Sequence, residues 1–189
     1  MLDEYRSTFI PAYQKVVQTI VQELHLEPTG RNAKTTDSIV QKLKRGSMKL
    51  SRMQDIAGCR LTVSDIVEQD GVVNSLLTLF PDSTVVDRRN KPSNGYRAVH
   101  VIVAEEGKRI EIQVRTEMQH LWAQYSEWLS DIIDPSIKYG GGSYIIQEQL
   151  SDHSALIHDF ETIEGHIPGD IRKEFAEALQ KSLDRLNAL

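Results

Sequence analysis

The stretch that decides the fold reads Ile110-Glu111-Ile112-Gln113-Val114-Arg115. Its apolar and polar residues alternate strictly, which predicts a β-strand with the three apolar side chains on one face. The other face then carries a carboxylate, an amide and a guanidinium in a row. These groups can bind a metal ion, form neutral hydrogen bonds and hold a phosphate, respectively. Taken alone, the pattern also fits a half-exposed strand with a mixed-charge outer face.

The residues that precede this strand predict a turn and a partner strand. Residues 98–104 are largely apolar and reach the strand over 109–115 across the short segment 105–108, a pattern typical of a β-hairpin. Asn94-Gly95 is a turn signal, which would leave Tyr96 exposed at a loop exit. A helix with an apolar face is expected over 116–129.

The rest of the chain predicts an α+β fold with a mixed sheet of about five strands flanked by helices. Helical spacing of apolar residues indicates helices over 5–26, 38–43 and 67–80, and strands are expected after Gly58 and over 83–87. Gly140 to Gly142 mark a break, and two helices are expected beyond it, over 144–163 and 170–187. The expected organisation is therefore an N-terminal helix at 1–28, a core at 29–132 and a helical extension at 140–189.

Length and composition restrict the class of protein. A chain of 189 residues suits one domain with attached helices. No window holds eighteen uninterrupted apolar residues, so no membrane span is expected, and the first residues do not resemble a secretory signal. The one cysteine, Cys59, cannot form an internal disulfide and is expected to be a small buried hydrophobe. A cytoplasmic setting follows as the default.

The net charge of −5 conceals an uneven distribution along the chain. Residues 31–60 carry a net charge of +6, whereas residues 117–189 carry −8. A basic segment inside an acidic protein predicts a compact, local polyanion as its ligand, and a nucleoside triphosphate fits this description better than a long duplex.

Two carboxylates stand where a metal site would need them. Asp55 comes just before one predicted strand, and Glu111 lies within another. Two carboxylates beside phosphate-binding bases suggest Mg²⁺, which takes one or two protein carboxylates together with phosphate oxygens. The alternative is a helix cap at Asp55 and a surface ion pair at Glu111. His153 and His158 lack further ligands at useful spacing and are interpreted as solvated helix positions.

Three blocks of sequence resemble the synthetase domain of the RelA/SpoT family. They are Asp55 to Arg60, Lys91 to His100 and Glu111 to Thr116, and the resemblance covers roughly residues 30–130. It implies a sheet similar to that of nucleotidyltransferases. It also implies an ATP-dependent pyrophosphokinase that moves pyrophosphate from ATP to a ribose 3′-hydroxyl, commonly of GDP or GTP, and releases AMP.

The same resemblance implies roles for individual residues. Asp55 and Glu111 would hold Mg²⁺, and Glu111 could also accept the proton of the attacking hydroxyl. The residues implied to bind ATP are Arg31, Lys34, Lys42 and Arg60. Those implied to bind the acceptor are Lys91, Asn94, Tyr96 and His100, with Tyr96 stacked on the base. Gln113 and Arg115 would support the site from the strand of Glu111.

Two alternatives stay open beside the synthesis of (p)ppGpp. The first is a toxin that pyrophosphorylates the 3′-terminal adenosine of tRNA and has an antitoxin protein as partner. A basic patch would then grip the tRNA backbone; its members are Lys42, Lys44, Arg45, Lys49 and Arg52. The second alternative is a nucleotide-binding regulatory module with weak catalysis. The C-terminal helices could also pair between copies of the chain in a homo-oligomer.

Overall fold

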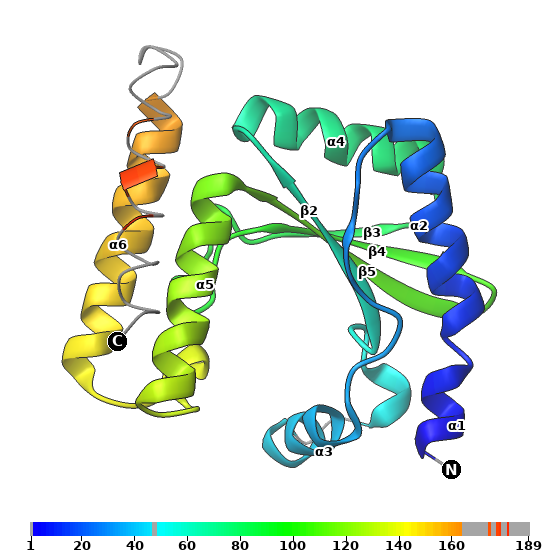
Figure 1. The fold of residues 1–189 in the computed structure, drawn as a ribbon, viewed down its shortest axis with the longest axis horizontal. Helices are drawn as coiled ribbons and strands as arrows, with labels where there is room; N and C mark the ends of the chain where they lie inside the picture. Colours follow the sequence, from blue (N-terminus) through cyan, green and yellow to red (C-terminus); the bar gives the residue numbers. More distant parts are fainter. Residues whose placement is uncertain (1, 47–48, 164–173, 175–176, 179–180, 182–189) are drawn as a thin grey trace. The chain divides into compact units, whose positions relative to one another are not determined.

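The computed structural model describes residues 2–46 and 49–163 and four later positions, 174, 177, 178 and 181 (Figure 1). It confirms the predicted α+β class: a mixed sheet of five strands in the order β1-β2-β5-β4-β3, accompanied by helices. The strands are β1 (Thr29–Arg31), β2 (Ala57–Val63), β3 (Thr84–Asp87), β4 (Val99–Glu105) and β5 (Lys108–Thr116). The α-helices are α1 (Leu2–Ser7), α2 (Ile10–Leu24), α3 (Thr36–Arg45), α4 (Ile66–Leu79), α5 (Glu117–Ile132) and α6 (Tyr144–Ile163). Two short 3₁₀ helices are η1 (Leu50–Arg52) and η2 (Ile137–Tyr139).

The predicted hairpin is confirmed and fixes the register of the sheet. In the antiparallel pair β4–β5, Val99 is the partner of Val114 and Glu105 is the partner of Lys108. Two residues, Glu106 and Gly107, form the turn with φ of 49° and 71°. Positive φ at both central residues is the geometry of a type I′ turn, which matches the twist of the strands that it joins.

The predicted helix over 5–26 was wrong in one respect, since the structure has two helices there. The first ends at Ser7 and the second begins at Ile10. Pro11 explains the interruption, because its ring would clash with the carbonyl of Ser7, four residues earlier, in a continuous helix. At the start of α2 the same proline is tolerated, and the intervening Phe9 is buried.

The other predicted helices form with small changes in their bounds. Thr35 caps α3, and Thr116 and Gln119 form a capping box that starts α5. The helix predicted over 144–163 is present as α6, whereas the one predicted over 170–187 lies largely outside the described residues. The structure adds the three-residue edge strand β1, which pairs antiparallel with β2.

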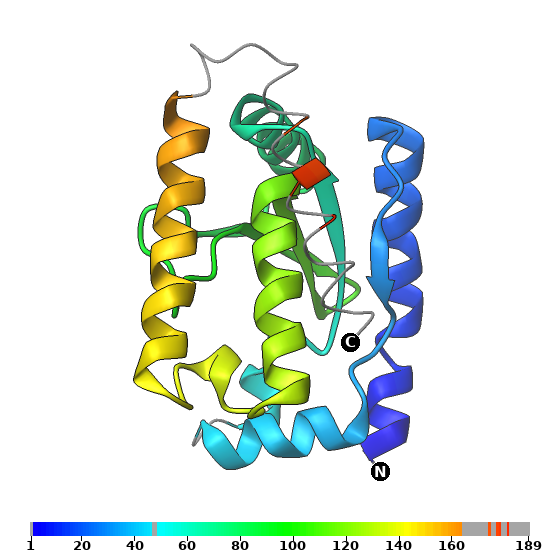
Figure 2. The same ribbon diagram turned by 60° about the vertical axis from the view of Figure 1, so that its left-hand side comes forward.

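The chain divides into two compact units. Unit 1 comprises residues 1–61, 68–86 and 99–114, and unit 2 comprises residues 62–67, 87–98 and 115–189. In unit 1, α2 packs on β4, and the core includes Val16, Ile20, Ile110 and Ile112, all fully buried. In unit 2, α5 and α6 lie side by side (Figure 2), joined by a core that includes Leu121, Trp122, Leu150 and Ile157.

None of the helices in the described part of the chain is long and apolar enough to cross a membrane.

Candidate functional site

Asp55 lies two residues before β2 and is held by two lysines of unit 1. Its Oδ2 atom accepts hydrogen bonds from Nζ of Lys34 and from Nζ of Lys42, the latter at 2.7 Å. The backbone N–H of Lys34 donates to the carbonyl of Ile56 at 2.6 Å, which keeps residue 34 beside this carboxylate. Lys42 comes from α3, which the fully buried Ile39 anchors. Burial alone would raise the pKa of Asp55, but the two ammonium groups outweigh it and hold the pKa below its ordinary value.

Glu111, in the middle of β5, is also held on both of its oxygen atoms. Its Oε1 lies 2.8 Å from Nδ1 of His100, and its Oε2 accepts a hydrogen bond of 2.9 Å from Nε2 of Gln113. Burial raises the pKa of Glu111, and the charge of Asp55 adds to that rise. The contacts with His100 and Gln113 act in the opposite direction and leave the pKa below its usual value. Asp55 is therefore among the charges that act on Glu111.

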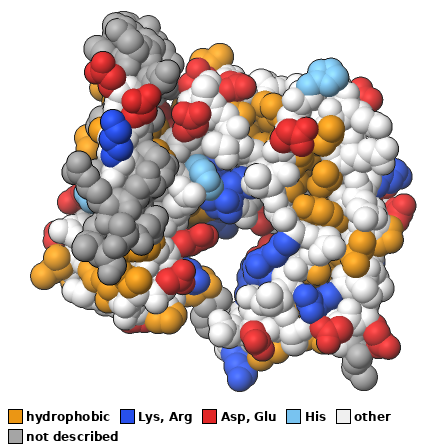
Figure 3. All heavy atoms as spheres, in the orientation of Figure 1, with side chains coloured by type: hydrophobic (Ala, Val, Ile, Leu, Met, Phe, Trp, Pro, Cys, Tyr) orange, Lys and Arg blue, Asp and Glu red, His pale blue; other side chains and the backbone are white. Residues whose placement is uncertain are grey.

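A glycine keeps the surface beside Glu111 open. A Cβ atom at Gly58 would lie 3.3 Å from Cβ of Glu111 and 2.6 Å from its carbonyl oxygen. Gly58 is the cross-strand partner of Arg31, so Arg31, Gly58 and Glu111 form a row across β1, β2 and β5. Directly opposed residues in paired strands share a face, and Arg60, two residues beyond Gly58, shares it too. In Figure 3, Lys and Arg side chains (blue) lie at and just above α3, in the part of unit 1 to which this row belongs.

Asp55 and Glu111 are the residues that could hold a metal ion. The Oδ1 atom of Asp55 is buried and accepts no hydrogen bond from the described residues. A bare carboxylate oxygen beside a second carboxylate suits a divalent cation, which would offset their mutual repulsion. No group of three or more His, Cys, Asp or Glu side chains converges anywhere in the described ranges. An ion held by Asp55 and Glu111 would leave coordination positions for phosphate oxygens.

The remaining predicted residues belong to unit 2, around the turn that carries Tyr96. Ser93 and Tyr96 exchange backbone hydrogen bonds of 3.2 and 3.0 Å across Asn94 and Gly95, whose φ angles are 51° and 82°. The hydroxyl of Tyr96 accepts a hydrogen bond of 2.9 Å from Nη2 of Arg115, whose guanidinium carbon lies 4.8 Å from the ring centroid. The Asn94-Gly95 turn is thus confirmed, but Tyr96 is half-buried against the core and not exposed as expected, and its ring already has a cationic neighbour.

The predicted site residues thus fall into two sets, each assembled within one unit. Unit 1 contains the cluster of Asp55 with its two lysines and the cluster of Glu111 with His100 and Gln113. It also contains the sheet face that carries Arg31 and Arg60. His100, predicted to border the acceptor pocket, contacts Glu111. In unit 2, Lys91 and Asn94 are exposed, whereas Arg115 is only 4% exposed.

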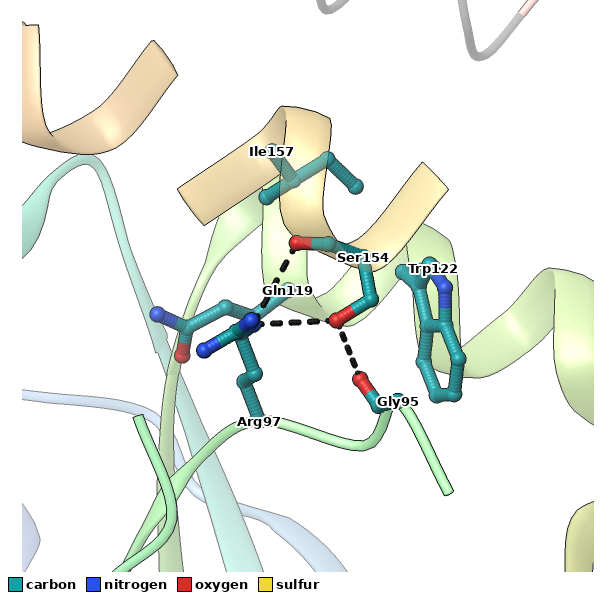
Figure 4. Close-up of a pocket in the computed structure, with 6 residues that line it drawn as sticks. All are labelled: Gly95, Arg97, Gln119, Trp122, Ser154 and Ile157. Carbon is teal, nitrogen blue, oxygen red and sulfur yellow. Dashed lines mark hydrogen bonds between the residues drawn. The ribbon is translucent and has the colours of Figure 1, made fainter. Parts of the chain in front are cut away.

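Arg97 and Ser154, which were not among the predicted site residues, secure the turn of unit 2 (Figure 4). Nε of Arg97 donates to the backbone oxygen and to Oγ of Ser154, at 3.2 and 2.9 Å, and the Ser154 hydroxyl donates to the carbonyl of Gly95 at 2.6 Å. One turn before Ser154, the carbonyl of Leu150 accepts a 2.9 Å hydrogen bond from the Trp122 indole. A polar residue in the apolar stripe of the predicted helix 144–163 was the signal that could have revealed Ser154.

Two minor expectations concern reactive side chains. Cys59 is buried, as predicted, and burial and then the charge of Glu111 raise the pKa of its thiol to about 12. His153 is exposed and His158 half-buried on α6, and neither belongs to a cluster of potential metal ligands in the part of the molecule that the structure describes.

Comparison with known proteins agrees with this fold. An uncharacterized protein of Mycobacterium tuberculosis is 37% identical over 111 residues, which are 57% of this chain and 41% of the relative. A GTP pyrophosphokinase of Photobacterium angustum is 32% identical over 89 residues, which are 44% of this chain and 12% of that protein. The chain therefore spans less than half the length of these relatives.

Solved structures cover more of the chain. Small alarmone synthetase 1 from Bacillus subtilis aligns with a TM-score of 0.64 at 25% identity, over 90% of this chain and 99% of that one. The same protein bound to its product pppGpp aligns with a TM-score of 0.62 at 25% identity, over 89% and 96% of the two chains. The family model described as "Region found in RelA / SpoT proteins" matches residues 31–129, more than half of the chain. The three blocks around Asp55, Tyr96 and Glu111 lie within that match, and the chain belongs to the RelA/SpoT family.

Proposed function

We propose that this chain is an ATP-dependent pyrophosphokinase that transfers pyrophosphate to the ribose 3′-hydroxyl of GDP or GTP, forming (p)ppGpp and AMP. The observation that carries the proposal is the pair of clusters in unit 1, where Asp55 with two lysines lies near Glu111 with His100 and Gln113. A guanine nucleotide is proposed as the acceptor because the Photobacterium relative is named a GTP pyrophosphokinase and the Bacillus synthetase was solved with its product pppGpp.

In the proposed reaction, the 3′-oxygen of the acceptor attacks the β-phosphorus of ATP. A new O–P bond forms, and the bond from the β-phosphorus to the oxygen bridging it to the α-phosphorus breaks. AMP leaves with that bridging oxygen and its electron pair, and the hydroxyl proton passes to a base. Negative charge gathers on the non-bridging and leaving oxygens, so the protein chiefly has to supply positive charge and alignment.

Lys34 and Lys42 are suited to supply that charge. Both are partly exposed, with side-chain exposures of 18% and 34%, so each is desolvated enough to act strongly and remains reachable. Both already bind an oxygen anion, Oδ2 of Asp55. A triphosphate bound beside Asp55 would share these ammonium groups with that carboxylate. Arg31 and Arg60, on the face next to Glu111, would hold the adenine of ATP, since a guanidinium plane stacks on flat ring systems.

Glu111 would be ionised near neutral pH in the ligand-free protein, because its pKa lies below its ordinary value. An ionised carboxylate with a lowered pKa is better suited to bind a metal ion than to accept a proton, because an efficient general base has a pKa nearer to the working pH. His100 contacts one oxygen of Glu111 and Gln113 the other, so the carboxylate is oriented before any substrate arrives.

Mg²⁺ is part of the proposal and would be held by Asp55 and Glu111. When bound, it would supply Lewis-acid stabilisation of the phosphate oxygens. The bare Oδ1 of Asp55 supports this assignment. It can be tested without turnover, by the electron paramagnetic resonance signal of Mn²⁺ added with a non-hydrolysable ATP analogue. Asp55→Asn should weaken Mn²⁺ binding at least tenfold, and unchanged Mn²⁺ binding would remove Asp55 from the site.

The function itself is tested with γ-labelled ATP and two acceptors, GDP or GTP in one series and deacylated tRNA in the other. We expect AMP release and label on the guanine nucleotide. Label on tRNA alone would contradict the proposal in favour of the toxin alternative. Nucleotide binding without AMP release, whatever the acceptor, would favour the regulatory module.

A further inference from the structure

We propose that Ser154 of α6 is a positioning residue for the turn that presents Tyr96, and that it thereby sets the affinity for the acceptor nucleotide. The inference rests on the proposed function, because it takes residues 93–97 as the acceptor loop. It extends that function to a helix that lies beyond residues 31–129, the part of the chain that the family model matches.

The acceptor loop contains an unfavourable backbone conformation at its centre. Ser93 and Tyr96 exchange two backbone hydrogen bonds across it, at 3.2 and 3.0 Å. Asn94, at the centre of the turn, has a φ of 51°, a conformation that costs free energy for a residue with a side chain. A turn of this kind persists only where its surroundings hold it in place.

Ser154 supplies that support at the residues on either side of Tyr96. Its hydroxyl donates to the carbonyl of Gly95 at 2.6 Å, and its Oγ accepts from Nε of Arg97 at 2.9 Å. One small side chain therefore bonds to the residue before Tyr96 and to the residue after it. Ser154 is 3% exposed, so both bonds are shielded from water and neither is readily replaced by solvent.

The surroundings of Ser154 leave the loop little room to move. A Cβ atom at Gly95 would lie 2.5 Å from the Trp122 ring and 3.2 Å from the carbonyl of Leu150. The cavity between loop and helix measures about 10 Å³ (Figure 4), which is room for one water molecule at most. The Trp122 indole is itself tied to α6 through its hydrogen bond to Leu150. The loop, α5 and α6 are thus packed against one another in unit 2.

A second contact fixes α6 further along the same face. The carboxylate of Glu161, two turns after Ser154, accepts hydrogen bonds from the Thr116 hydroxyl and, at 3.0 Å, from Nε2 of Gln119. Thr116 follows Arg115, whose guanidinium lies over the Tyr96 ring. Both sides of the Tyr96 environment therefore depend on α6, through Ser154 at the loop and through Glu161 at the start of α5.

Ser154→Ala removes the hydroxyl and leaves the carbonyl of Gly95 without that donor. We expect the KM for GDP or GTP to rise about tenfold, while kcat and the KM for ATP change by less than about twofold. The backbone amide of Tyr96, which donates to Ser93, should also exchange its hydrogen faster in the variant. A residue with a merely structural role would change both substrates alike or neither.

The matched control is Ser151→Ala, because Ser151 is exposed on the same helix and should leave all three readouts at their original values. Acceptor KM and Tyr96 exchange that stay unchanged in Ser154→Ala would overturn the inference. An equal loss of ATP and acceptor affinity would overturn it as well. A wild-type protein that releases no AMP would refute the proposed function, whereas the exchange of the Tyr96 amide would still decide whether Ser154 holds the loop.

Discussion

Replacing Gly95 by alanine should destabilise the protein severely, for two reasons that can be separated. Gly95 has a φ of 82°, a conformation that residues with a Cβ atom adopt only at a cost of about 1–2 kcal/mol. The new methyl group would also lie 2.5 Å from Cζ2 of Trp122, far inside van der Waals contact. The indole cannot easily swing away, because its N–H is bonded to the carbonyl of Leu150.

The second cost is that of overpacking a buried site, about 1–3 kcal/mol. The two costs together give about 2–5 kcal/mol lost from the free energy of unfolding, and for a chain of this size Tm should fall by roughly 5–15 °C. The same substitution should raise the KM for the acceptor nucleotide, since the turn that carries Tyr96 must shift.

Two other glycines provide the controls. Gly107, in the hairpin turn, has a φ of 71° but no atom within 4 Å of an added Cβ, so Gly107→Ala measures the backbone cost alone. Gly71 lies within helix α4 with open space around it, so Gly71→Ala should stabilise the protein by about 0.5–1 kcal/mol. Urea denaturation followed by circular dichroism gives all three values. If Gly95→Ala cost no more than Gly107→Ala, the contact between the loop and Trp122 would be refuted.

Three further predictions concern single side chains. Lys42→Met should raise the KM for ATP about 10–100-fold in steady-state assays, because one charge-assisted contact with a phosphate is lost. The control Lys138→Met changes an exposed lysine and should leave this KM unchanged, so equal effects of the two substitutions would refute the phosphate contact. Glu111→Gln should lower kcat by a factor of about 10²–10⁴. The control Glu127→Gln changes an exposed residue and should leave kcat unchanged. Full turnover by the Glu111→Gln variant would rule out the proposed role of Glu111. Cys59 should resist a thiol reagent at pH 8 until the chain unfolds. Burial raises its pKa from 9.0 to about 12, which makes its thiolate about a thousandfold rarer than in the unfolded chain. Rapid labelling of the folded protein would contradict this prediction.

Residues with strong periodicity or turn chemistry made most of the fold predictable. The alternation over Ile110 to Arg115 predicted β5, and Asn94-Gly95 predicted the turn before Tyr96. The break at Gly140 to Gly142 predicted the start of α6. Strand β1 escaped prediction because three exposed residues carry no periodic signal. Its conformation depends on its pairing with β2, where Gly30 faces Cys59 and Arg31 faces Gly58.

The candidate site was predictable as a set of residues but not as a set of contacts. Sequence resemblance singled out Asp55 and Glu111, and the structure adds which side chains hold them. That Lys34 and Lys42 meet on one oxygen depends on how α3 packs, which no local pattern encodes. Ser154 interrupts the apolar stripe of its helix, but that signal does not reveal its partner, because the hydrogen bond to Gly95 depends on tertiary packing.

The sharing of a single Asp55 oxygen by two ammonium groups has a consequence for how tightly a nucleotide could be held. An arriving triphosphate would not meet bare cations, because each lysine already has an anionic counterpart. Each lysine would exchange part of its ion pair with Asp55 for one with a phosphate. The free energy gained from the phosphate contact would therefore be reduced by the weakening of the contact with Asp55. On dissociation the original pairing can re-form, so Asp55 again compensates one of the two positive charges in the empty protein. Such an arrangement favours rapid turnover of ligands over tight retention.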